Sequence, residues 1–232
     1  VALLVEQDER GTVVLGEQGV LSHLRPGAIV MDMSTVGVEA TDRLKQACRA
    51  RNIAFVDAPV GRPVESAVRG ESLFMVGCDD DAVLARVTPL LEAMGNRIFS
   101  CGPAGMGTRM KLVNNFIVLV TAEVVAEAIA LGTALGLDIR TMHDVTAATT
   151  AQNGQFQTLM VNKALRGDLE PGFTIDLAFK DLSLAQAAAA ERRLGLPLGA
   201  AALAVFGGAR AGAYAKKDFS ALLHLACERA GL

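Results

Sequence analysis

The first hundred residues alternate short apolar runs with longer stretches in which apolar residues recur at helical spacing. Strands that alternate with helices in this way predict an α/β domain with a parallel sheet. The helical stretches are 38–51 and 80–94, and residues 1–5 are consistent with one more strand. The apolar runs that predict strands are 28–31, 53–56, 72–76 and 97–99.

The pattern changes after residue 103. Residues 105–136 predict a single helix of about 45 Å, and no further strand is predicted beyond it. The chain is therefore expected to hold an α/β domain at 1–103 and an all-helical domain at 104–232. The other helices are predicted at 139–146, 154–165, 174–194, 198–212 and 219–230.

The composition of the chain limits the kinds of partner that it can bind. Hydrophobic residues make up 51% of the chain but aromatic residues only 4%, so the core is expected to be aliphatic. The 22 basic and 25 acidic residues leave no cationic surface for nucleic acid or an anionic membrane, which favours a small-molecule partner. The longest apolar run, 116–130, contains Glu123 and Glu127 and predicts no membrane span.

The four cysteines are scattered, without a CxxC pair or a nearby group of histidines. This spacing predicts neither a metal site nor a disulfide framework, and it fits a reducing cytoplasm. The chain begins with Val1 inside an apolar run. We therefore expect that its beginning is missing.

A glycine-rich segment that leads into a helix is the strongest local feature. Gly102-Pro-Ala-Gly-Met-Gly lets the backbone pass close to a ligand or to another element. Lys111, Asn114 and Asn115 follow at helical spacing and project from one face. These three side chains predict a polar functional site. In the alternative interpretation, Lys111 extends to solvent and the two asparagines only form hydrogen bonds with neighbouring backbone groups.

Two further groups follow predicted strands, where open α/β sheets bind ligands. Arg62 can hold a carboxylate, phosphate or sulfonate, or can simply be solvated in a turn bounded by prolines. Ser34 and Thr35 can meet a cofactor, or can cap the helix at 38–51.

Lys180 and Asp181 lie within the helix predicted at 174–194. Asp176 lies four residues before Lys180, so a surface ion pair between the two is the alternative interpretation. The chain contains no GxSxG, HExxH or Walker-type loop.

Taken together, these segments resemble the β-hydroxyacid dehydrogenase family, which includes the 3-hydroxyisobutyrate dehydrogenases. The resemblance implies the C-terminal part of a Rossmann doubly wound sheet, followed by an all-α domain like the C-terminal domain of 6-phosphogluconate dehydrogenase. It also implies a homodimer or homotetramer and a GxGxxG fingerprint upstream of residue 1. The segments that carry it are Asp32-Met-Ser-Thr, Asp57-Ala-Pro-Val, Gly70-Glu-Ser-Leu-Phe-Met-Val-Gly, Gly102-Pro-Ala-Gly-Met-Gly, Lys111-Leu-Val-Asn-Asn and Lys180-Asp-Leu.

The resemblance also implies roles for individual residues. The ammonium of Lys111 would supply a proton to the developing alkoxide, or its amine would remove one in the reverse direction. The cofactor would be NAD or NADP, with NADH preferred. The substrate-binding residues would be Gly61, Arg62, Asn114 and Asn115, and the cofactor-binding residues Ser34, Thr35 and Lys180.

One loop departs from the family pattern. Gly61-Arg62-Pro63 stands where most members have Ser-Gly-Gly, and it is similar to the loop of sulfolactaldehyde reductases. We therefore expect an NAD(P)-dependent reductase of a small acidic aldehyde, with 3-sulfolactaldehyde preferred. The alternatives are tartronate semialdehyde, succinic semialdehyde or 3-hydroxyisobutyrate chemistry and, in a different class, a non-catalytic binding or scaffold protein.

Overall fold

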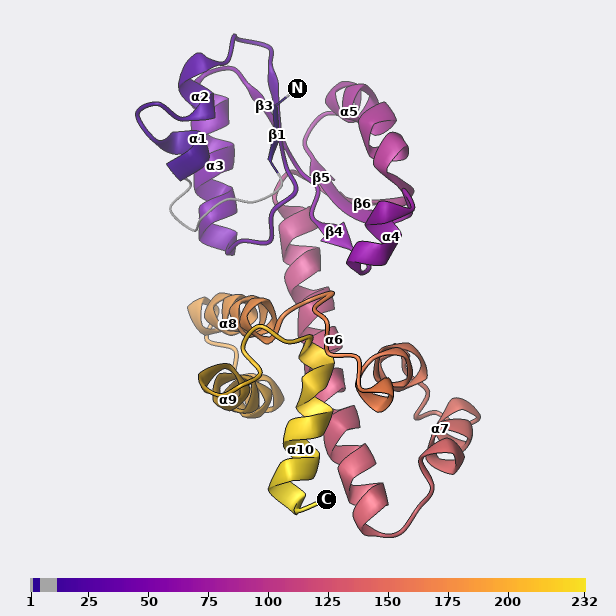
Figure 1. Ribbon diagram of the computed structural model, residues 1–232. Helices are drawn as coiled ribbons and strands as arrows, with labels where there is room; N and C mark the ends of the chain where they lie inside the picture. The colour runs from indigo at the N-terminus through magenta and orange to yellow at the C-terminus, as the bar shows by residue number, and fades with distance from the viewer. Residues whose placement is uncertain (1, 5–11) are drawn as a thin grey trace. The chain divides into compact units, whose positions relative to one another are not determined.

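The computed structural model describes residues 2–4 and 12–232 (Figure 1). It divides into two compact units, Val1–Asn114 and Asn115–Leu232, within the long helix α6 (Met106–Ala134). The division falls inside the helix because its first turns contact the sheet of the first unit. The domain boundary near residue 103 stays a prediction.

The first unit is built on a six-stranded sheet. The first three strands run parallel to one another, and the strand carrying residues 72–78 runs antiparallel to its neighbour. The strands are β1 (Ala2–Leu4), β2 (Ile29–Asp32), β3 (Ala54–Asp57), β4 (Val60–Gly61), β5 (Ser72–Cys78) and β6 (Gly95–Gly102). They follow the order β1-β2-β3-β5-β4, with β6 on β5.

The α/β fold class is confirmed, but the sheet is mixed rather than parallel throughout. Only β4 and the short helix α4 (Val64–Val68) separate β3 from β5. A helix of that length spans about 7 Å, too little to return the chain along the sheet for a parallel strand. Short elements such as α4, α1 (Thr12–Leu15) and α2 (Val20–His23) were not predicted.

Helices cover both faces of the sheet. Val30 and Phe55 point from β2 and β3 toward α3 (Val38–Ala50), where they pack near Leu44. Alternate residues such as Met31 and Val56 point to the opposite face and cluster with residues of α5 (Asp81–Met94). Both helices and all four predicted strands are confirmed within three residues at each end. The strand expected at 1–5 is β1, and residues 1 and 5 lie outside the described part.

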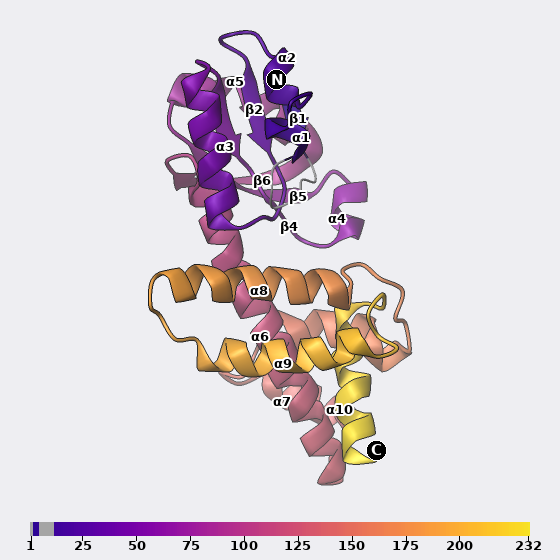
Figure 2. The same ribbon diagram turned by 90° about the vertical axis from the view of Figure 1, so that its left-hand side faces the viewer.

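The second unit is all helical, as predicted. Figures 1 and 2 show α8 and α9 side by side, and α10 alongside the C-terminal half of α6. The helical stretch predicted at 154–165 is present, but it consists mainly of a π-helix at Gln155–Met160 and a 3-10 helix at Ala164–Arg166, and Phe156 and Met160 are buried. The elements after α6 are α7 (Ile139–Ala147), η1 (Gln155–Met160), η2 (Ala164–Arg166), α8 (Ile175–Glu191), α9 (Pro197–Ala211), η3 (Phe219–Ala221) and α10 (Leu222–Ala230).

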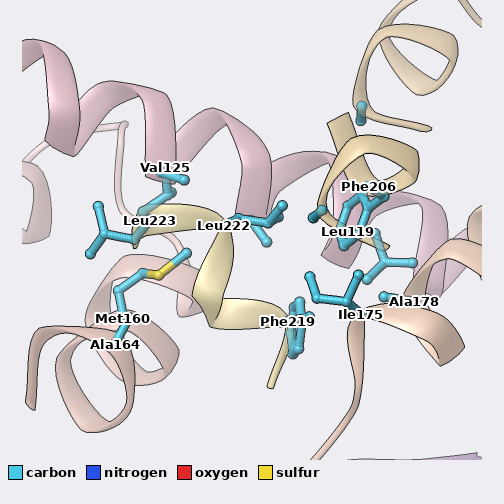
Figure 3. Packing of buried hydrophobic residues seen from close by; sticks show 14 of the residues in the cluster. Leu119, Val125, Met160, Ala164, Ile175, Ala178, Phe206, Phe219, Leu222 and Leu223 are labelled. Atoms are coloured by element: carbon cyan, nitrogen blue, oxygen red, sulfur yellow. The ribbon is translucent and has the colours of Figure 1, made fainter. Parts of the chain in front are cut away.

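The core of the second unit is mostly aliphatic, as the composition predicts, although Phe156, Phe206 and Phe219 are also buried in it. Leu119 and Val125 of α6 meet Leu222 of α10 and Phe206 of α9 in one cluster (Figure 3). Small residues bring the helices close together: a Cβ on Gly199 would lie 2.6 Å from the ring of Phe116.

Within the described part of the chain, α6 is the one helix that is long and apolar enough to span a membrane by length and composition. In this structure, several apolar residues of α6 pack in the core of the second unit. Leu119, Ala122, Ala126 and Ile129 are fully or almost fully buried in the core of the second unit. Packing therefore accounts for much of the hydrophobicity of α6.

Glu123 is an acidic residue on the apolar helix α6. Its side chain is buried, and its Oε2 has no hydrogen-bond partner among the described residues. Burial, and to a smaller extent the nearby Glu127, raise the pKa of Glu123 from 4.5 to about 7, with Arg229 opposing the shift. The folded protein therefore holds a proton between these two pH values that the unfolded chain releases.

Glu123→Gln tests this assignment. Stability of the wild type should fall as the pH rises from 4.5 to 7, and the neutral glutamine removes that loss. Relative to wild type, the free energy of unfolding of the variant should rise by up to about 3 kcal/mol between about pH 5 and about pH 8. Urea unfolding at both pH values measures this difference, with Glu191→Gln, an exposed glutamate at the end of α8, as the control. An equal effect of Glu123→Gln at both values would contradict the raised pKa.

Candidate active site

Lys111 lies near the start of α6 and is half-buried in the first unit. Its Nζ donates a hydrogen bond to the carbonyl oxygen of Val60 at 2.7 Å. Val60 directly precedes Gly61 and Arg62. The structure thus brings Lys111 to the loop that sequence analysis singled out separately.

Asp57 holds the beginning of α6. One carboxylate oxygen accepts from the amide of Gly105 and the other from the amide of Thr108, both at 2.6 Å. The carboxylate therefore caps the helix whose second turn carries Lys111. Burial raises the pKa of Asp57, and these hydrogen bonds oppose the shift. The sequence signal for Asp57 is its place at the end of a buried strand, within the Asp57-Ala-Pro-Val motif.

The glycines of this region allow close backbone approach. A Cβ on Gly107 would lie 2.2 Å from the carbonyl oxygen of Met75, and one on Gly77 would lie 2.3 Å from the carboxylate of Asp57. The glycine-rich segment was expected to approach either a ligand or another element of the protein. These contacts are with another element, the sheet. The two glycines let α6 begin directly against the sheet.

Arg62 follows β4 with its backbone in the left-handed region, at φ 71°. Its Nη1 donates to the carbonyl oxygen of Glu71 at 2.7 Å and to the side-chain oxygen of Asn96 at 2.8 Å. Its Nη2 and Nε have no partner within residues 2–4 and 12–232, and the side chain is exposed. Gly61 beside it is buried, and a Cβ there would approach Leu73 to 3.2 Å.

Ser34 and Thr35 follow the carboxyl end of β2, which pairs with β3 at Asp32 and Asp57. Neither caps α3, because the N-cap of that helix is Gly37 and it has no side-chain cap. The capping alternative is therefore wrong. The amide of Ser34 donates to Asp32 at 2.9 Å, but its buried hydroxyl has no partner in the described part of the chain. An unsatisfied hydroxyl at the carboxyl ends of parallel strands fits contact with a nicotinamide cofactor.

A second polar cluster lies in the second unit. The side-chain amide of Asn115 donates to one oxygen of Asp181 at 2.6 Å, and Nζ of Lys180 lies 2.9 Å from the other oxygen. Asp181 is buried, whereas 42% of the Lys180 side chain is exposed. Asp181 thus joins two residues that were proposed independently, although Asp181 itself was named beside Lys180 without a role.

The alternative ion pair of Lys180 is also wrong. Asp176 instead contacts Lys216 at 2.6 Å and Arg210 at 3.0 Å. Asn114, the last residue of the first unit, is half-buried on α6. Helix α6 therefore carries Lys111, Asn114 and Asn115 within a little more than one turn.

Comparison with known proteins places these residues in a family. The family described as the NAD binding domain of 6-phosphogluconate dehydrogenase matches residues 1–102. The family described as NAD-binding of NADP-dependent 3-hydroxyisobutyrate dehydrogenase matches residues 105–226. The 3-sulfolactaldehyde reductase of Escherichia coli (strain K12) is 38% identical over 232 residues, which cover 100% of this chain and 78% of that protein. This chain belongs to the β-hydroxyacid dehydrogenase family.

The dehydrogenase is also similar to proteins with other named substrates. The NAD-dependent L-serine dehydrogenase of Pseudomonas aeruginosa is 35% identical over 217 residues, covering 91% of this chain and 72% of that protein. The structure of Mycobacterium tuberculosis 3-hydroxyisobutyrate dehydrogenase with L-serine has a TM-score of 0.83 at 33% identity. It covers 89% of this chain and 72% of that one. The enzyme is thus an NAD(P)-dependent hydroxyacid dehydrogenase, whose relatives act on small hydroxyacids or semialdehydes.

Proposed function

We propose that the enzyme reduces 3-sulfolactaldehyde to 2,3-dihydroxypropane-1-sulfonate, and that Arg62 binds the sulfonate. The observation that carries the proposal is an arginine at a positive φ. Left-handed backbone costs a non-glycine residue about 1 kcal/mol or more. Strained backbone of this kind occurs at ligand-binding sites, and in Arg62 it accompanies N–H groups that make no contact within the described residues.

The side chain of Arg62 is suited to that role. Its Nη1 is fixed by two hydrogen bonds, which orient the guanidinium plane. Three N–H groups on Nη2 and Nε remain for a tetrahedral anion that keeps its negative charge at neutral pH. The 38% identity to a 3-sulfolactaldehyde reductase supports the same substrate.

Lys111 is proposed as the catalytic residue. A bound nicotinamide cofactor supplies the hydride for reduction or accepts it in oxidation. During reduction, negative charge grows on the aldehyde oxygen, and the ammonium of Lys111 stabilises that charge and transfers a proton to the oxygen. In the oxidative direction its amine accepts the proton of the hydroxyl. The hydrogen bond to Val60 holds Nζ in place in this structure.

The remaining polar residues are proposed to orient the substrate and to bind the cofactor. Asn115, assisted by Asn114, orients the substrate, and Asp181 fixes the rotamer of the Asn115 amide through their 2.6 Å hydrogen bond. Ser34, Thr35 and Lys180 hold the cofactor, for which the unsatisfied hydroxyl of Ser34 is the structural support. We propose NADH as the cofactor, as in the relative named as NAD-dependent; NADPH is the alternative, because the family matched by residues 105–226 is described by an NADP-dependent enzyme. Turnover with each cofactor at equal concentration tests that preference.

Two substitutions of Arg62 separate binding from folding. Both Arg62→Ala and Arg62→Gly should raise KM for 3-sulfolactaldehyde about 30-fold, the loss of about 2 kcal/mol of charge-assisted contact. The glycine variant relieves the positive φ and should be about 1 kcal/mol more stable than the alanine variant. Steady-state kinetics and urea unfolding measure the two effects. An unchanged KM in either variant would remove Arg62 from the substrate site.

We further propose a homodimer or homotetramer, in which α6 contributes to the interface. Ile117, Val124 and Leu131 are exposed on α6, and their spacing of seven residues places them on one face. Val124→Glu should shift the sedimentation coefficient toward that of the monomer, whereas Leu177→Glu on α8 should not. A wild-type protein that sediments as a monomer would contradict the proposal.

A cytoplasmic location is proposed as well. All four cysteines are unpaired in the structure, as expected for a protein kept in a reducing compartment.

A further inference from the structure

The first unit has a cavity that none of the proposed active-site residues lines. Its volume is about 400 Å³, and it lies where the chain enters β3 at Asn52–Phe55 and leaves β5 at Cys78–Asp80. Residues of α3 and α5 complete its walls. We propose that this cavity, here called the β3 pocket, binds a phosphate monoester.

The charges in the β3 pocket favour an anion. Lys45, Arg49 and Arg86 line it together with Asp79 and Asp80, so three cations face two carboxylates. The formal excess is one positive charge. Asp79 pairs with Lys45, which leaves Arg49 and Arg86 against Asp80.

Asp80 caps α5 by accepting from the amide of Ala82 at 2.7 Å. Asp79 accepts from the amide of Ala104 at 2.9 Å, and its other oxygen lies 3.3 Å from Nζ of Lys45. Each carboxylate therefore contacts a backbone amide, and Asp79 also contacts Lys45. Neither carboxylate contacts Arg49 or Arg86 in the structure.

Arg49 and Arg86 have no hydrogen-bond or ion-pair partner among the described residues, although both line the β3 pocket. Arg49, in the last turn of α3, also interacts favourably with the end of the helix dipole. Arg86 lies in the middle of α5, and it is exposed to solvent, as Arg49 is. Two uncommitted guanidinium groups at one cavity match an anion of charge near −2 with three acceptor oxygens, as a phosphate monoester provides.

The size and the floor of the pocket indicate an organic group attached to the phosphate. Sites for small organic ligands begin at about 300 Å³, and a bare inorganic anion would leave much of this cavity unfilled. Ile53, Phe55 and Val83 supply apolar surface between the charged side chains. The proposed ligand therefore combines a phosphate held by the arginines with an apolar part held by these three residues.

Calorimetric titration of the full chain without nicotinamide or aldehyde tests the β3 pocket. Phenyl phosphate is the probe, and inorganic phosphate is the comparison. Phenyl phosphate should bind saturably and more tightly than inorganic phosphate. The double variant R49S/R86S should weaken binding at least about tenfold, because charged hydrogen bonds to the phosphate are lost. Arg97→Ser, an exposed arginine on β6 outside the pocket, should leave it unchanged.

Three results would overturn the proposal. They are the absence of saturable binding to wild type, equal affinity for the two probes, and undiminished affinity in R49S/R86S. The last result would place the phosphate elsewhere on the protein, including where a nicotinamide cofactor is held. Urea unfolding of the double variant confirms that a loss of binding is not a loss of folding. The test does not depend on the proposed substrate, so the two proposals can fail separately.

Discussion

Replacing Lys111 with methionine should lower kcat for aldehyde reduction by about 10²- to 10⁴-fold, the usual contribution of a positioned acid or base. Methionine keeps much of the length and apolar stem of lysine but carries no proton to transfer. The hydrogen bond to Val60 is also lost, but that contact is only partly buried and is expected to contribute little to stability. KM should change far less than kcat, because the ammonium acts on charge that develops in the transition state.

Lys163→Met is the matched control for that variant. Lys163 also donates to a backbone carbonyl, that of Glu170 at 3.0 Å, and has no proposed part in catalysis. Its kcat should stay within about twofold of wild type. A Lys111→Met enzyme that keeps more than about a tenth of wild-type kcat would contradict the catalytic role of Lys111.

Replacing Asp57 with asparagine should lower the free energy of unfolding by about 2–3 kcal/mol, since a hydrogen bond to a charged group contributes about 1.5–3 kcal/mol. The amide group of asparagine has one acceptor oxygen, so it can accept from Gly105 or from Thr108 but not from both through separate oxygens. Its NH₂ group would then face a buried backbone N–H. Because Asp57 fixes the start of α6, kcat should fall as Lys111 loses its position.

Asp79→Asn provides the stability control for Asp57→Asn. Asp79 also accepts from a backbone amide of the same segment, that of Ala104, but its side chain is 55% exposed. Its loss should cost less than about 1 kcal/mol, since solvent replaces the contact. Urea unfolding compares the two variants. Equal stability would show that the two buried hydrogen bonds of Asp57 do not hold α6 in place.

Much of the fold followed from periodicity, and the exceptions have physical causes. Long segments such as α3, α5, α6 and α8 carry enough turns for an apolar face to be visible in the sequence. Helices of four or five residues, such as α1 and α4, do not. The antiparallel orientation of β5 depends on how far its short connection can reach, which no single-strand pattern contains. The π-helical turn at Gln155–Met160 reflects core packing rather than local preference.

The candidate site was only partly predictable for a related reason. Residue types and family motifs pointed to Lys111, Arg62 and Asn115, but the partners of these residues come from distant parts of the chain. The Asp181 contact with Asn115 joins residues 66 positions apart, and Asp57 reaches Gly105 across 48 positions. Competing local interpretations, such as capping by Ser34, could be rejected only once Gly37 was seen to begin α3.

The most direct test of the substrate assignment is the kcat/KM of the wild-type enzyme with NADH as the cofactor. The value for 3-sulfolactaldehyde is compared with the values for tartronate semialdehyde, succinic semialdehyde and methylmalonate semialdehyde. Selectivity should favour the sulfonate by about tenfold or more, because a tetrahedral sulfonate presents three acceptor oxygens to Arg62 where a carboxylate presents two. Equal or faster turnover of any of the three carboxylate aldehydes would contradict the account.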